Sequence, residues 1–306
     1  MRQELNAGKM RKSINFIDNI VYSRQPDLEG NMMELKMSVM LQNGNSEMRL
    51  AAGVDDEEDK EPKPAILWVP GGGYRGTDKN LMVPEMMFLA DAGYVVASMY
   101  YRSSAEGHFP DQIIDVKTAI RFLRAHAEEY EIDPERIGVI GRSAGGHLSA
   151  LAAMNEDLYD SEEWKEYSSD VQACCDMFGP VDLVKLMEFD AYMMEHDPNY
   201  RWKTVEDTHA GALMGGEVST MIDRARLASP PYLLTDRMAP MMILHGDCDK
   251  LVPVEISEEF YKKIVEAGME DRTELCILKG AGHGTREFFQ PLLKDVIVRF
   301  FDKYLK

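Results

Sequence analysis

The stretch 136–154, "RIGVIGRSAGGHLSALAAM", joins two structural types across a single serine. Residues 136–140 form a short apolar run typical of a buried strand, whereas 147–154 has the composition of a helix. The glycines between them are costly to order, because glycine loses more backbone freedom on folding than any other residue. Such a cost indicates a tight turn or a close backbone approach. The stretch therefore predicts a strand, a sharp turn that carries Ser143, and a helix.

Residues Gly141–Gly145 fit the pattern G-x-S-x-G, in which a serine lies on a sharp turn from a strand into a helix. In that position the hydroxyl is exposed at the end of a strand and can act as a nucleophile. The pattern by itself has low specificity, since many chains contain it by chance. It predicts a nucleophile only if a base, a carboxylate and suitable hydrogen-bond donors accompany it.

Continuous apolar runs alternate with helical patterns over most of the chain. The runs lack in/out alternation, as expected when helices cover both faces of a parallel sheet. A helix is predicted at 111–130, with Asp111 as its N-cap, and another at 256–268. This alternation predicts an α/β fold with a mostly parallel, doubly wound sheet, whose ligands bind at the carboxyl ends of the strands. The predicted core strands are 64–70, 93–101, 136–141, 171–179, 240–246 and 273–280.

The composition limits the classes of partner and compartment. A chain of 306 residues can bury a sizeable core, and we expect a single domain over 1–306. The formal net charge of −19 disfavours nucleic acid, because phosphate binding needs clustered lysine and arginine, and it equally disfavours anionic membranes. The N-terminus lacks the apolar run of a secretory signal, and the four cysteines follow no metal or redox spacing. We expect a cytoplasmic protein with reduced thiols.

Two segments interrupt the alternation of strands and helices. The acidic run "DDEEDKE" at 55–61 predicts a solvated loop before the first core strand. Between Leu183 and Leu233 no strand is predicted, although bulky apolar and aromatic side chains are frequent. A long excursion of this kind is commonly functional. The sequence therefore predicts a lid or cap at about 184–232, with a packed surface insertion as the alternative.

A serine hydroxyl becomes a nucleophile when a base takes its proton, and a neutral imidazole suits that task. His283 is the predicted base, because flanking glycines in "GAGHGT" allow a loop to carry the ring toward the carboxyl edge of the sheet. His147 lies one helical turn after the serine and is expected to point away from it. His196 and His209 lie in the predicted lid, where a substrate contact is the open alternative. The other histidines, His108, His126 and His245, are expected to be structural or solvated.

The base needs a carboxylate that fixes its tautomer and stabilises the imidazolium. The stretch "HGDCDKLVP" at 245–253 follows a predicted strand and offers Asp247 and Asp249. Their spacing to His283 does not separate the two. The chain order of serine, aspartate and histidine is that of the α/β hydrolases, and each of the three comes directly after a predicted strand.

Acyl transfer also needs donors aimed at the oxyanion that develops in the reaction. The stretch "VPGGGYRG" at 69–76 places Gly71–Gly73 directly after the first core strand, where backbone N–H groups can approach a ligand closely. Together with the N–H of Ala144 they predict an oxyanion hole. A plain glycine turn is the alternative, but it would not explain the position of this motif relative to the others.

These motifs resemble those of the α/β-hydrolase esterases allied to hormone-sensitive lipase. Bacterial acetyl esterases, acetylxylan esterases and feruloyl esterases form the nearest branch. The resemblance runs from about residue 15 to the C-terminus, and it is highly specific for the superfamily but much less so for the substrate. It is carried by "PGGGY", "GRSAGGH", "GPVDL", "LMGG", "HGDCDKLVP" and "GAGHG".

The resemblance implies roles for particular residues, with no cofactor and no metal. The implied nucleophile, acid and base are Ser143, Asp249 and His283. The implied oxyanion donors are Gly72, Gly73 and Ala144.

Two residues depart from the lipase-like pattern. Pro70 stands where many members have histidine, a variant also met in the acetyl and feruloyl esterase branch. Arg142 stands where an acidic residue is frequent, and it either tunes the surroundings of the serine or pairs with the abundant carboxylates. Neither change alters the expected chemistry.

The sequence thus predicts a serine carboxylesterase that cleaves small acyl esters through an acyl-enzyme. The resemblance suggests acetyl or feruloyl groups on short plant-derived oligosaccharides as substrates. The alternatives are amide or peptide hydrolysis, as in arylformamidases and prolyl oligopeptidase relatives, and a non-catalytic ligand-binding homologue. The expected partner is a small-molecule ester, with neither nucleic acid nor membrane. Assembly into a homo-oligomer is left open.

Overall fold

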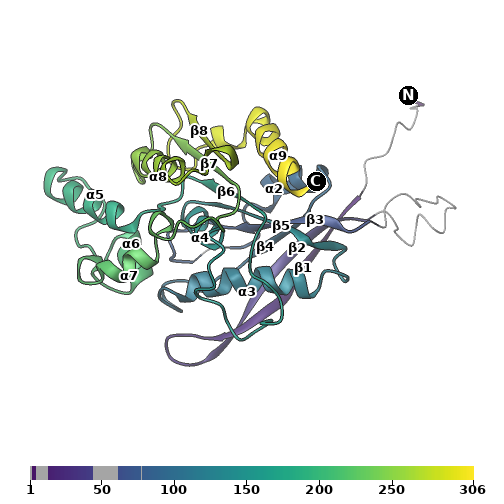
Figure 1. The fold of residues 1–306 in the computed structure, drawn as a ribbon, viewed down its shortest axis with the longest axis horizontal. Helices are drawn as coiled ribbons and strands as arrows, with labels where there is room; N and C mark the ends of the chain where they lie inside the picture. The colour runs from purple at the N-terminus through teal and green to yellow at the C-terminus, as the bar shows by residue number, and fades with distance from the viewer. Residues whose placement is uncertain (1, 5–12, 44–60, 77) are drawn as a thin grey trace.

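An eight-stranded sheet forms the centre of the computed structural model, which describes residues 2–4, 13–43, 61–76 and 78–306 (Figure 1). The strand order across the sheet is β1-β2-β4-β3-β5-β6-β7-β8. Of the acidic run 55–61, only Glu61 lies within the described residues. The strand bounds are Ser13–Pro26 (β1), Met32–Asn43 (β2), Lys63–Val69 (β3), Val95–Met99 (β4), Ile132–Arg142 (β5), Ala173–Met177 (β6), Met241–Gly246 (β7) and Thr273–Leu278 (β8).

Most neighbouring strands run parallel. Every pair from β4 across to β8 is parallel, whereas β1 with β2 and β2 with β4 are antiparallel. The predicted mostly parallel sheet is confirmed, and all six predicted core strands are present. Parallel pairing brings the loops that follow β3, β5, β7 and β8 to one edge of the sheet. That edge is where the sequence placed the glycine loop, Ser143, the two aspartates and His283.

Helices cover both faces of the sheet because apolar strand residues point alternately to either side. In β3, Leu67 packs into one core cluster with α3, α4 and α8. The next residue, Trp68, packs into the other cluster with α2 and α9. The helix bounds are Val83–Asp91 (α2), Asp111–Ala125 (α3), Ala144–Ala152 (α4), Leu183–His196 (α5), His209–Met214 (α6), Ile222–Leu227 (α7), Val254–Glu266 (α8) and Pro291–Leu305 (α9).

The helix predicted at 111–130 differs from α3 at both ends. Pro110 occupies the N-cap position and no described side chain caps the helix, so Asp111 is the first helical residue and not the cap. The Asp111 carboxylate instead lies 3.3 Å from the guanidinium of Arg102. The chain leaves helical geometry at His126, whose ring stacks on Phe122 with the centroids 4.0 Å apart. His126 is therefore half-buried beyond the helix end and not part of a solvated helix face.

The segment 184–232 holds α5, α6 and α7 and two short 3-10 turns, Val218–Thr220 and Pro230–Tyr232. These helices gather at one end of the sheet, at the left of Figure 1. Their inner side joins the main core, in which Leu213 and Ala225 are fully buried. Movement of this segment as a lid stays a prediction.

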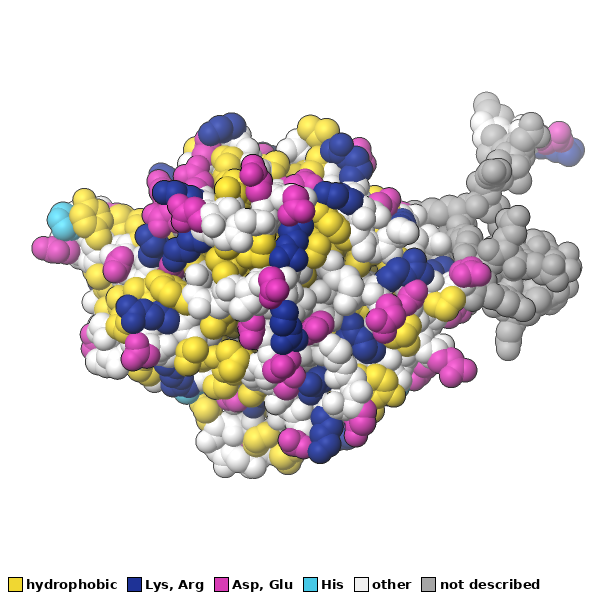
Figure 2. All heavy atoms as spheres, viewed as in Figure 1, with side chains coloured by type: hydrophobic (Ala, Val, Ile, Leu, Met, Phe, Trp, Pro, Cys, Tyr) yellow, Lys and Arg dark blue, Asp and Glu magenta, His cyan; other side chains and the backbone are white. Residues whose placement is uncertain are grey.

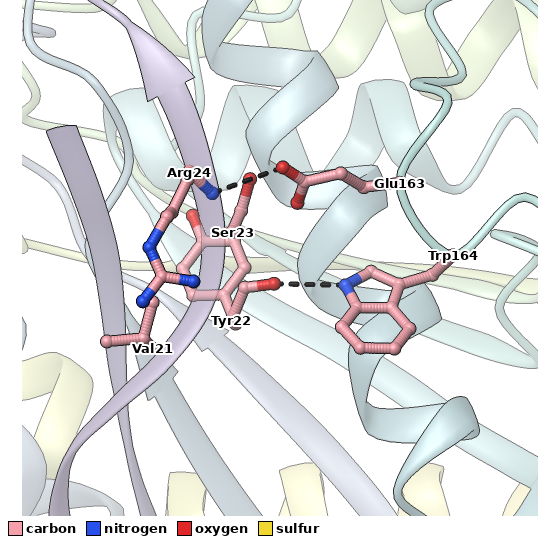
Figure 3. A pocket seen from close by; sticks show the side chains of 6 residues that line it. All are labelled: Val21, Tyr22, Ser23, Arg24, Glu163 and Trp164. Atoms are coloured by element: carbon pink, nitrogen blue, oxygen red, sulfur yellow. Dashed lines mark hydrogen bonds between the residues drawn. The ribbon is translucent and has the colours of Figure 1, made fainter. Parts of the chain in front are cut away.

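The N-terminal strand β1 is hydrogen-bonded to the connection between α4 and β6. The backbone N–H of Arg24 donates to the Glu163 carboxylate at 3.2 Å, and the indole N–H of Trp164 donates to the Tyr22 carbonyl at 3.0 Å (Figure 3). A cavity lies here, but its lining contains no serine–histidine pair.

No disulfide joins the four cysteines, all of which lie in the described part of the chain. Cys174 and Cys175 are buried in β6, where burial raises the pKa of both thiols. Within the described ranges, no helix combines the length and the apolarity that crossing a membrane would need.

Candidate active site

Ser143 lies on a strained turn between β5 and α4. Its backbone has φ 52° and ψ −123°, a combination that non-glycine residues rarely adopt. Its N–H donates to the Met177 carbonyl of β6 at 2.8 Å, which holds the turn against the sheet. On the other side the turn meets β3 so closely that a Cβ at Gly145 would overlap the Val69 carbonyl oxygen. The glycine-rich sequence around the serine is thus explained by close packing on both sides.

A chain of hydrogen bonds connects Ser143 to a buried carboxylate. Ser143 Oγ lies 2.8 Å from His283 Nε2, and His283 Nδ1 lies 2.6 Å from Asp249 Oδ2. The other oxygen, Oδ1, accepts from the N–H groups of Leu251 and Val252 at 2.8 and 2.9 Å. An ionised carboxylate can only accept, so Nδ1 of His283 carries the proton and Nε2 is free to accept from the serine hydroxyl.

Asp249 stays ionised although its side chain is fully buried. Burial opposes the charge, but hydrogen bonds from His245, His283 and the Val252 N–H outweigh it and hold the pKa of Asp249 well below its usual range. His245 Nε2 lies 3.3 Å from Asp249 Oδ2, and its Nδ1 lies 2.7 Å from the Ser257 hydroxyl. The result is a fixed negative charge against the ring of His283.

The structure separates the two aspartates that spacing could not. Asp247 faces away from His283: its Oδ1 accepts from the Gly280 N–H at 2.6 Å, and its Oδ2 lies 3.4 Å from Lys279 Nζ. Asp247 therefore joins the loops that follow β7 and β8, whereas Asp249 is the carboxylate that reaches the histidine.

The predicted donors adjoin the serine. Gly72 and Gly73 line the same cavity as Ser143 and His283. The N–H of Ala144 begins α4, where the helix dipole favours negative charge. Among the described residues no acceptor is found for the N–H of Gly72, Gly73 or Ala144. Backbone donors in this state can receive an oxyanion.

The cavity around Ser143 has a volume of about 250 Å³. Beside the predicted residues, the cavity is lined by Phe178, Arg201, Leu251 and Gly284, which no sequence pattern marked as site residues. His209 and Arg142, whose roles the sequence left open, also line it. Arg201 and His209 come from the segment 184–232. The only signal that could have found Arg201 was a basic residue inside the predicted lid of an acidic chain.

His147 and His209 have different surroundings. His147 is fully buried, with Nδ1 2.9 Å from the Tyr74 hydroxyl and Nε2 2.6 Å from the Ala228 carbonyl, so its role is structural, as predicted. His209 packs its ring against Gly73, where it occupies the space that a Cβ would need, and the positive φ of Gly73, 59°, also disfavours a side chain. Burial, reinforced by the nearby charges of Arg201 and Arg75, lowers the pKa of His209 to about 4. His209 is therefore neutral at neutral pH.

Comparisons with known proteins agree with this geometry. The BD-FAE family model matches residues 54–264, which include Ser143 and Asp249 but end before His283. The probable carboxylic ester hydrolase LipM of Mycobacterium tuberculosis is 32% identical over 203 residues, covering 66% of this chain and 44% of LipM. The chain spans about half the length of the curated relatives it matches.

Two solved structures share the fold over nearly the whole chain. A truncated carbohydrate esterase from gut microbiota has a TM-score of 0.74 at 27% identity, covering 97% of this chain and 98% of that one. The esterase Est2 of Thermogutta terrifontis, solved also with bound propionate or butyrate, has a TM-score of 0.67 at 25% identity, covering 96% of this chain and 91% of Est2. The expected fold and the resemblance to α/β-hydrolase esterases are confirmed. The chain belongs to the BD-FAE family and has the α/β-hydrolase fold.

Proposed function

We propose that this chain is a carboxylic ester hydrolase that uses Ser143 as its nucleophile. The observation that carries the proposal is the hydrogen-bonded chain from Ser143 through His283 to the ionised Asp249. It lies in a cavity beside backbone N–H groups that have no acceptor among the described residues. The esterase names of the relatives and structural neighbours support the same reaction class.

In this mechanism Ser143 Oγ attacks the ester carbonyl carbon while His283 Nε2 takes the hydroxyl proton. The negative charge that develops on the carbonyl oxygen is stabilised by the N–H groups of Gly72, Gly73 and Ala144. The alcohol then leaves with the proton from Nε2, and an acyl group remains on Ser143. A water molecule, deprotonated by the same nitrogen, cleaves this acyl-enzyme and releases the carboxylic acid. Asp249 holds Nδ1–H throughout and stabilises the imidazolium.

The substrate we propose is a small acyl ester, with acetyl or propionyl as the preferred acyl group. The cavity of about 250 Å³ is smaller than the pockets of roughly 300–1,000 Å³ that hold drug-sized ligands. Propionate and butyrate bound to Est2, and the carbohydrate esterase among the neighbours, support short acyl chains and a sugar ester. An acetylated plant-derived oligosaccharide is the natural substrate that fits this proposal best.

A series of 4-nitrophenyl esters tests this proposal. We expect kcat/KM to be highest for acetate or propionate and to fall about tenfold or more for acyl chains beyond about eight carbons, because the cavity cannot enclose them. The matching 4-nitroacetanilide, an amide, is expected to be cleaved far more slowly than the acetate. Rates that rise steadily to long chains would replace the proposal with a lipase-like one, and faster cleavage of the anilide would favour amide hydrolysis.

A further inference from the structure

Among the described residues, the lining of the cavity around Ser143 includes two arginines, Arg142 and Arg201, and no acidic residue. This contrasts with the chain as a whole, which has 53 Asp and Glu against 34 Lys and Arg. On the face drawn in Figure 2, acidic (magenta) and basic (dark blue) side chains are interspersed. A cavity with basic lining in such a chain is a local arrangement that the overall charge does not explain.

Arg142 is the last residue of β5 and lies directly before the nucleophile. It is half-buried, yet its guanidinium makes no hydrogen bond or ion pair within the described part of the chain. Burial lowers the pKa of Arg142, with the Tyr101 hydroxyl as the partner that opposes this effect. That hydroxyl already donates to the Pro70 carbonyl at 2.9 Å. Pairing of Arg142 with a carboxylate, the alternative left open by the sequence, is not found among the described residues.

Arg201 comes from the connection between α5 and α6 and stacks on Trp202, its guanidinium carbon 4.2 Å from the ring centroid. It forms no ion pair with any described carboxylate. Asp190, whose pKa responds to Arg201, is buried and accepts a hydrogen bond from the Tyr200 hydroxyl. The N–H donors of Arg201 therefore remain available at the cavity, while stacking limits the positions that the side chain can take.

No neighbouring group among the described residues neutralises the charges of Arg142 and Arg201. Arg75, which lies over the same Trp202 ring, is a further cation, and its guanidinium already donates to the carbonyls of Asp207 and Thr208. His209 is neutral, and the ionised Asp249 is fully buried and bonded to His283. Guanidinium groups with free donors at a cavity bind carboxylate and similar oxyanions by charge-assisted, frequently bidentate hydrogen bonds.

We infer that the natural substrate is an ester that carries a second, anionic group such as a carboxylate, which Arg142 and Arg201 bind while Ser143 attacks the ester. The inference rests on the proposed function and specifies its substrate class. The anionic group can belong to the acyl part, as in the half-ester of a dicarboxylic acid, or to the alcohol part, as in an acetylated acidic sugar. In both cases an anionic group would contact the side chains of Arg142 and Arg201.

Two matched pairs of substrates distinguish the sources. For the acyl part, 4-nitrophenyl hydrogen glutarate is compared with 4-nitrophenyl pentanoate, which has the same chain length without the charge. For the alcohol part, 4-acetoxybenzoate is compared with 4-acetoxybenzamide. We expect the anionic member of at least one pair to have a kcat/KM about 10- to 100-fold higher, the range of a charge-assisted hydrogen bond. The preference should shrink in 0.5 M salt.

Arg201→Met should reduce this preference about tenfold, and Arg201→Lys should restore part of it because it keeps the charge. Arg142→Met should act in the same direction. The control is Arg226→Met, which removes an exposed arginine of α7 that pairs with Asp223 at 3.2 Å and does not line the cavity. Its ratio of anionic to neutral kcat/KM should equal that of the wild type.

Binding gives a readout that does not depend on turnover. Calorimetry with the Ser143→Ala protein should detect tighter binding of 4-acetoxybenzoate than of 4-acetoxybenzamide, or of 4-nitrophenyl hydrogen glutarate than of 4-nitrophenyl pentanoate. Adding Arg201→Met to the Ser143→Ala protein should remove the difference. Cleavage of neutral esters without any anionic preference, or a preference that survives both arginine substitutions, overturns the inference and leaves the proposed function intact. Charge-selective binding without turnover of any ester overturns the proposed function alone.

Discussion

Replacing Ser143 with alanine is expected to lower kcat for 4-nitrophenyl acetate on the order of 10⁴-fold or more. The substitution removes the oxygen that lies 2.8 Å from His283 Nε2 and would form the acyl-enzyme. Residual catalysis would come only from the backbone donors and from substrate binding. The fold should persist, because the backbone contacts that hold the turn, including the bond from the Ser143 N–H to Met177, do not use the hydroxyl. The measurement is steady-state kinetics together with thermal unfolding.

Ser149→Ala provides the matched control. This serine lies on α4, the helix that follows the turn carrying Ser143, and its buried hydroxyl has no hydrogen-bond partner among the described residues. Its substitution likewise deletes a serine Oγ, here from the adjoining helix, and should leave turnover within about twofold of wild type, as for a group outside the reaction. Turnover near the wild-type value in a folded Ser143→Ala protein would contradict the assignment of the nucleophile.

Asp249→Asn is expected to lower kcat about 10³- to 10⁴-fold. The amide can present its N–H₂ to His283 Nδ1, which would then have to accept, so the proton would move to Nε2 and the ring could no longer take the serine proton. Loss of the charge also removes the stabilisation of the imidazolium. A pH-independent loss across the working range is expected, because the low pKa of Asp249 keeps the wild-type carboxylate ionised there.

Asp247→Asn is the matched control for this prediction, two residues away in the same loop. Its carboxylate accepts from the Gly280 N–H at 2.6 Å, and an amide oxygen can accept the same bond. We expect a modest loss of thermal stability and only a small effect on kcat. A large kinetic loss at Asp247 with a small one at Asp249 would reverse the assignment of the acid.

The sequence was informative where one local motif determines both the backbone and the chemistry. The strand, turn and helix around Ser143 follow from the glycine pattern, and the structure brings Asp249 and His283 to the serine from loops after two other strands. The choice between Asp247 and Asp249 rested on the family pattern, because both follow the same strand. Only the turn after β7 directs one carboxylate inward and the other toward Gly280.

The residues that complete the cavity could not be found in this way. Arg201 and His209 lie in a segment of short helices whose position depends on tertiary packing, such as the burial of Leu213 in the core. Phe178 follows directly after β6, and its ring packs against that of His283 with the two ring centroids 4.9 Å apart. No local pattern marks such residues, since their proximity to Ser143 arises only when the sheet and its connections are assembled.

Helix α3 likewise shows which features a local sequence pattern predicts and which it does not. Apolar periodicity predicted a helix from 111, but the pattern carries no sign of its end at Ala125, after which His126 leaves helical geometry and stacks on Phe122. The terminal helix α9 and the bounds of the antiparallel strands β1 and β2 were likewise not predicted from the sequence. Their positions are set by contacts with distant elements, for example the bond from the Trp164 indole to Tyr22.

Labelling with a fluorophosphonate tests most directly whether Ser143 is the activated nucleophile of a hydrolase. Such a reagent bonds covalently to a serine that a neighbouring base has activated. Peptide mapping by mass spectrometry of the folded protein should place a single adduct on Ser143, with ester turnover lost in step with labelling. The heat-unfolded protein and the Asp249→Asn variant should react far more slowly. An adduct on another residue, or full turnover with Ser143 unlabelled, would contradict the account.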